Sequence, residues 1–148
     1  MYATAQDLID RFGEQELVDR TDTDGTGAYD AGRVDQALRD GWADVEPYLL
    51  ERYPEFTDGS LVRDDVPEKV VGLQCDFARA RLWDDAENEK VEKAETRAIR
   101  FLERVAEGKQ KLVAPKPQAE SAQSAGVSIS QGRNRYDDGS LGRFQGLA

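Results

Sequence analysis

The stretch from residue 66 to residue 85 carries apolar side chains on two opposite sides of a helical wheel. One side comprises Val66, Val70, Leu73, Phe77 and Ala80, and the other comprises Val71, Cys75, Ala78 and Leu82. A helix at the surface of a protein needs only one apolar stripe, so two stripes indicate that other elements cover it on both sides. We therefore predict a central helix, around which the chain before about residue 108 packs.

Three further helical patterns precede this stretch. Thr4 and Asp7 form a capping-box pattern at the start of a short helix, and a second short turn covers residues 14–19. Asp30 is a good N-cap for a long helix, and we expect Pro47 to kink that helix without breaking it, because the proline lies opposite the apolar stripe. The apolar residues that recur at helical spacing in this segment are Ala31, Val34, Leu38, Trp42, Val45, Leu49 and Tyr53.

A last helix is predicted from Asn88 to Glu107, with Gly108 ending it. No alternating pattern typical of strands occurs before residue 108. The expected fold of residues 1–107 is therefore all-α, a small bundle of about three long and one or two short helices.

After residue 107 the composition changes. Residues 108–126 are predicted to be a linker, rich in Pro, Ala, Ser and Gln and without periodicity, and residues 127–148 an extended tail that has too few apolar residues for a core of its own. Alternation at the start of the tail suits strand addition to a partner, and apolar residues every third position near its end suit a groove. The predicted partner-binding residues are Val127, Ile129, Arg133, Arg135, Tyr136, Leu141, Arg143, Phe144 and Leu147.

Charge separates the same two parts. The chain has 148 residues and a net charge of −10, but residues 1–107 hold 14 Lys and Arg against 27 Asp and Glu, whereas residues 108–148 hold 6 against 3. An acidic body argues against nonspecific binding of duplex DNA, which needs a basic face. A basic tail favours an acidic partner.

Several classes of protein are disfavoured by what the sequence lacks. The single cysteine, Cys75, excludes an intrachain disulfide and falls on an apolar face, where a buried structural thiol is expected. The N-terminus has no signal-peptide pattern, and no segment is apolar enough to span a membrane, so we expect a protein made in the cytoplasm. With no histidine in the chain, we expect neither catalytic residues nor a cofactor.

The segment Asp22–Gly25 has the sequence DTDG, which invites comparison with a calcium loop. Aligning Gly25 with the required glycine of an EF-hand loop places Arg20 at the first ligand position and Ala31 where the bidentate Glu belongs. Because two essential ligands are missing, we predict no metal site but an Asp-rich turn before a helix.

Charged residues on the helices suggest structural roles. Asp76 and Arg79 lie three residues apart on one polar strip of the central helix, and we predict that they form an ion pair that sets its register. The last helix carries alternating charges, typical of a solvated helix but also able to form ion pairs between copies in a ring. Trp83 falls outside both apolar faces and is a candidate interface residue.

Four stretches together resemble a known family. They are MYATAQDLIDRFGEQELVDRTD, VDQALRDGWADVEPYLLERY, CDFARARLWDD and KAETRAIRFLERVAEGKQKL, which in order and spacing are similar to the Mu-like prophage family of head–tail connector proteins, also called neck adaptor or head-completion proteins. The resemblance covers about residues 1–112. Here Ala80 stands where the family often has Tyr, and the segment after the long helix differs.

The resemblance implies a non-enzymatic virion protein of the phage neck. Such adaptors are small helical domains that form a ring, commonly of twelve copies, beneath the portal protein. The ring continues the DNA channel without specific DNA binding and offers a platform to the next neck or tail protein, and its termini often reach neighbouring copies or the portal. The alternative is a regulatory module, in which an acidic helical body presents the tail as a peptide motif to another protein.

Overall fold

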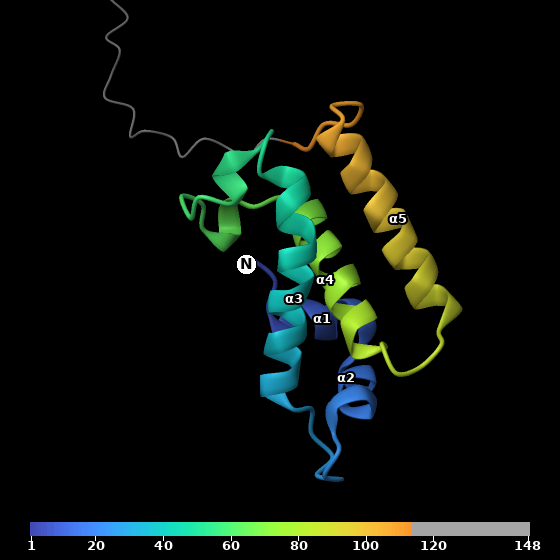
Figure 1. The fold of residues 1–148 in the computed structure, drawn as a ribbon. Helices are drawn as coiled ribbons and strands as arrows, with labels where there is room; N and C mark the ends of the chain where they lie inside the picture. The colour runs from blue at the N-terminus through green and yellow to red at the C-terminus, as the bar shows by residue number, and fades with distance from the viewer. Residues whose placement is uncertain (114–148) are drawn as a thin grey trace, which may run out of the picture. The chain divides into compact units, whose positions relative to one another are not determined.

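A computed structural model describes residues 1–113 of the chain, and this part is all-helical (Figure 1). The predicted all-α fold is confirmed for these residues. Five α-helices and two short 3₁₀-helices follow one another: α1 Ala5–Phe12, α2 Glu14–Thr21, α3 Ala31–Leu49, η1 Pro54–Phe56, η2 Arg63–Asp65, α4 Glu68–Leu82 and α5 Glu89–Ala106. None of these helices is both long enough and apolar enough to cross a bilayer.

Local sequence signals set the helix starts. The Thr4 hydroxyl accepts the Asp7 amide and the Asp7 carboxylate accepts the Thr4 amide, which completes the predicted capping box. Asp30 caps α3 and Asn88 caps α5, each by accepting backbone amides of the first turn. Helix α3 continues through the exposed Pro47, so the expectation that this proline does not break the helix is confirmed.

Helix α3 ends earlier than its apolar spacing predicts. The spacing continues to Tyr53, but the helix stops at Leu49 and residues 50–52 form a turn. Tyr53 precedes Pro54, and the ring of a proline disfavours helical backbone in the residue before it. The Tyr53 hydroxyl instead accepts the amide of Leu112 at 3.0 Å, so this side chain holds the chain that follows α5.

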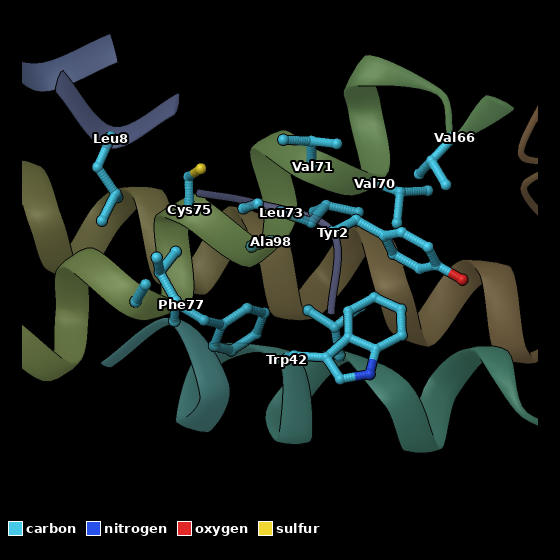
Figure 2. Close-up of a cluster of buried hydrophobic side chains, with 14 of the residues drawn as sticks. Tyr2, Leu8, Trp42, Val66, Val70, Val71, Leu73, Cys75, Phe77 and Ala98 are labelled. Carbon is cyan, nitrogen blue, oxygen red and sulfur yellow. The ribbon is translucent and has the colours of Figure 1, made fainter. Parts of the chain in front are cut away.

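Helix α4 is central, as its two apolar faces predict. It packs against α3, α5, α1 and α2, and Figure 2 shows its side chains inside the apolar cluster. Its fully or almost fully buried residues come from both faces: Val70, Val71, Leu73, Gln74, Cys75, Phe77 and Ala78. Burial raises the pKa of the Cys75 thiol to about 12, as expected for a structural cysteine that is kept neutral.

Helices α3 and α4 approach so closely at Gly41 that no side chain fits there. A Cβ at this position would lie 2.7 Å from the Ala78 amide nitrogen and 2.8 Å from the Gln74 carbonyl oxygen. Both are backbone atoms, which cannot move aside without shifting a helix. The missing side chain of Gly41 therefore sets the spacing of the two helices.

The buried polar side chain of Gln74 is the feature of the core that the periodicity did not reveal. Its amide group donates to the Leu38 carbonyl at 2.9 Å, and its oxygen accepts the amides of Tyr2 at 3.0 Å and Ala3 at 2.8 Å. Each buried polar atom is thus satisfied, as it must be to avoid a desolvation penalty. This one side chain connects α4 to α3 and to the N-terminal segment.

The close approach at Gly41 gives a direct test of this packing. Gly41→Ala should lower the free energy of unfolding by about 1–3 kcal/mol, because the added methyl overpacks a contact between two backbones. Denaturant unfolding followed by circular dichroism measures the change.

Gly72→Ala is the matched control, since it makes the same change in the middle of α4. There the added Cβ meets only the end of the flexible Arg11 side chain, at 3.1 Å. Its stability should stay the same or rise, because alanine favours helix over glycine. Equal losses in both variants would contradict the role given to Gly41.

Candidate functional site

The nine predicted partner-binding residues of the tail lie outside the described residues. The same is true of the tail itself, residues 127–148, and of the linker after residue 113. Their role therefore stays a prediction. What the structure does describe is the charged surface of the helical body and the polar side chains that connect its helices.

The predicted ion pair between Asp76 and Arg79 is wrong. Arg79 pairs with Glu16 of α2 through two parallel bonds, from Nε to Oε1 at 2.6 Å and from Nη2 to Oε2 at 2.8 Å. A carboxylate that meets the guanidinium edge-on satisfies two donors at once. Arg79 therefore joins α4 to α2 instead of setting the register of α4 alone.

Asp76 is left half-buried between charged neighbours. Burial raises the pKa of its carboxyl group above the ordinary value, and the positive charges of Lys69, Arg11, Arg79 and Arg97 oppose this increase without cancelling it. The residue therefore weakens the folded state slightly when it is ionised.

Glu16 is the centre of a polar cluster that also includes Trp83. The Trp83 indole nitrogen donates to Glu16 Oε1 at 2.8 Å, and the Arg79 guanidinium lies 4.3 Å from the centre of the Phe12 ring. Arg20 lies 4.1 Å above the Trp83 ring. Trp83, which the sequence suggested as an interface residue, thus has an intramolecular role, and the cluster fastens α1 and α2 to the end of α4.

The DTDG segment forms the predicted Asp-rich turn. The Asp22 carboxylate accepts the amides of Thr26 at 2.9 Å and Gly27 at 2.7 Å, and these hydrogen bonds lower its pKa. Both carboxylate oxygens are thereby used by the loop itself. Within residues 1–113, no three side chains of the types that bind metals come together.

The charges of α5 are sorted into stripes. At 100° per residue, its five basic residues fall within about 80° of the helix circumference, and all five are exposed. We call them the basic stripe: Lys90, Lys93, Arg97, Arg100 and Arg104. Three glutamates, Glu89, Glu92 and Glu103, lie beside them. The pattern is alternating in sequence but segregated in space.

The outer surface of α1 and α2 has the opposite character. These two helices contain five acidic and two basic residues, and both arginines are engaged internally, Arg11 with Glu68 at 3.1 Å and Arg20 with Asp85 at 3.3 Å. We call the three exposed acids that remain the acidic face: Asp10, Glu14 and Asp19. Asp10 and Asp19 accept hydrogen bonds from glutamines one turn earlier, and none of the three forms an ion pair within the described residues.

The two carboxylates near Arg79 should respond in opposite ways to loss of charge. Glu16→Gln should destabilise the protein by roughly 1–3 kcal/mol, because it breaks a mostly buried ion pair that also receives the Trp83 indole. Asp76→Asn should leave stability unchanged or raise it at pH 7, because it removes a desolvated charge.

The pH dependence gives the second readout. Because the folded pKa of Asp76 is raised, the wild type should lose stability relative to Asp76→Asn as pH rises from about 3.8 through the raised pKa. Urea unfolding of both proteins over this range measures the difference. A constant difference across that range would refute the raised pKa, whereas a wild type that gains stability relative to Asp76→Asn as pH rises would restore Asp76 as a structural ion-pair partner.

Comparison with known proteins identifies the family. The sequence model described as bacteriophage Mu, Gp36 matches residues 2–131. This match covers the whole helical body and continues into the start of the tail, beyond the stretch of resemblance that the four helical segments define. No curated protein matches the chain. Since the match spans most of the chain, the protein belongs to the bacteriophage Mu Gp36 family.

Proposed function

We propose that this protein is a structural component of the phage particle, a head–tail connector that forms a ring beneath the portal, continues the DNA channel and joins head to tail. The observation that supports this most strongly is membership of the bacteriophage Mu Gp36 family over residues 2–131. In this proposal its place is the neck of the virion, and it acts by binding, not as an enzyme, and without a cofactor.

Three partners follow from this role. They are the portal protein, neighbouring copies in a ring of about twelve, and the next neck or tail protein, as the resemblance of residues 1–112 to neck adaptors implies. The body supports a channel role through its charge, since 27 acidic residues outnumber 14 basic ones in residues 1–107. Such a surface repels DNA phosphates, so DNA passes without being gripped.

The tail is proposed as the latch to the portal, to an adjacent copy or to the protein below. Residues 108–148 have 6 basic and 3 acidic residues, the opposite balance to the body. A basic segment with spaced apolar residues suits an acidic surface with apolar pockets.

Mixing the purified protein with its portal should give a ring-shaped complex, visible by electron microscopy and with a mass that reports the number of copies. Deleting residues 114–148 should weaken this complex at least roughly tenfold, because the latch contacts are removed. The helical circular-dichroism signal should remain, since the described helices end at Ala106.

A full-length variant separates the apolar contacts of the tail from its length. Tyr136→Ser, Leu141→Ser and Phe144→Ser together should weaken the complex as the deletion does. Normal docking of both tail variants would refute the latch but not the connector. Absence of any complex with the wild type, together with regulatory genes instead of portal, capsid and tail genes as neighbours, would favour the regulatory module.

A further inference from the structure

We propose that the basic stripe of α5 binds the acidic face of α1 and α2 on a second copy of the chain. This deepens the proposed function, on which it rests, by assigning the surfaces that join one copy to the next. The stripe consists of Lys90, Lys93, Arg97, Arg100 and Arg104, and the face of Asp10, Glu14 and Asp19.

The basic stripe is available for a partner. All five side chains are exposed, and among the described residues Lys93 alone of the five forms an ion pair, with Glu89 on the same helix. Arg97 donates to the Lys93 carbonyl and forms no ion pair in this part of the chain. These five cations therefore form a local positive patch on a body whose net charge is negative.

The acidic face is also available for a partner. Its neighbouring cations already have partners in the same chain, because Arg11 pairs with Glu68, while Arg20 pairs with Asp85 and lies over Trp83. These pairs occupy both arginines of α1 and α2, and they leave the three carboxylates of the acidic face without a cation partner among the described residues. This sorting is a result of the tertiary structure, since the sequence of α2 places Arg20 directly beside Asp19.

The two surfaces belong to separate parts of the body. Helix α5 packs on α3 and α4 and has no contact with α1 or α2 within residues 1–113 (Figure 1). One copy therefore does not join its own stripe to its own face. A contact between two different patches is heterologous, and such contacts generate rings when the rotation between copies closes.

Nucleic acid fits the basic stripe less well than a protein surface does. Glu89, Glu92 and Glu103 lie along its edge, and they would face the phosphates of a duplex that covered the stripe. The same glutamates add to the excess of 27 acidic over 14 basic residues in residues 1–107. Carboxylates without a cation partner, as on α1 and α2, complement the charge of the stripe.

Charge reversal on each surface tests the contact. One variant, R97E/R100E/R104E, changes the stripe, and another, D10K/E14K/D19K, changes the face; sedimentation velocity at low ionic strength measures self-association. Each variant alone should associate at least roughly tenfold more weakly than the wild type, because like charges then meet. An equimolar mixture should recover association, since the reversed stripe of one variant matches the reversed face of the other.

Three controls accompany these measurements. R33E/R39E reverses exposed charges on α3, outside both surfaces, and should associate as the wild type does. Circular dichroism and thermal unfolding should show all variants folded. Added salt should weaken the wild type and the rescued mixture alike, because both depend on screened charges.

The outcomes separate this inference from the connector role. Self-association that survives either reversal, a mixture that fails to recover, or a wild type that does not associate alone or with portal overturns the inference. Binding of a duplex DNA fragment that is lost in R97E/R100E/R104E also overturns it, in favour of a nucleic-acid surface. Rings on the portal that form equally with the reversed variants would overturn the contact between copies but keep the connector role. Rescue by mixing, without any ring on the portal, would keep the contact but overturn the connector role.

Discussion

The closeness of α3 and α4 at Gly41 is the constraint on which the rest of the body depends. With 2.7 Å between a hypothetical Cβ and the Ala78 amide nitrogen, the two backbones touch where other helix pairs interpose side chains. At this spacing the side chain of Gln74 reaches the Leu38 carbonyl across the interface and still holds the amides of Tyr2 and Ala3. The N-terminal segment, and α1 after it, are thus placed by a polar group inside an apolar core. Such a group specifies one arrangement, because any other leaves its hydrogen bonds unmade.

A second set of polar contacts attaches the short helices. Alone, α1 and α2 are only eight residues each and too short to be stable. In α2, Glu16 accepts from both Arg79 and Trp83, and Arg20 lies over the Trp83 ring. In α1, the Phe12 ring lies against the Arg79 guanidinium, so each short helix is held by contacts to α4 and the residue that follows it. These contacts use up the arginines that would otherwise neutralise the outer carboxylates. Fold stability and surface charge are therefore coupled in this region.

The arrangement of surface charges also relates the fold to the proposed assembly. Helix α5 needs only its apolar side for packing, which leaves its segregated charges exposed. In the proposed ring the acidic face of one copy would neutralise the basic stripe of the next. The remaining acidic surface would still repel DNA phosphates. In the proposal, the latch to the portal, to an adjacent copy or to the protein below is a different segment, the tail beyond residue 126.

By itself, the sequence determined the helical class, the central place of α4, the caps at Thr4, Asp30 and Asn88, and the resemblance to the Mu-like family. All of these depend on spacing within a few residues, which local backbone geometry translates directly into structure. Only the tertiary structure decided that Arg79 pairs with Glu16, 63 residues away, and that Gln74 is buried. A polar side chain finds its partner on whichever element packs beside it, and helical periodicity gives no information about which element that is. The grouping of the basic residues of α5 follows from helical periodicity, but the tertiary structure decided that this side stays exposed, because the apolar side packs against α3 and α4.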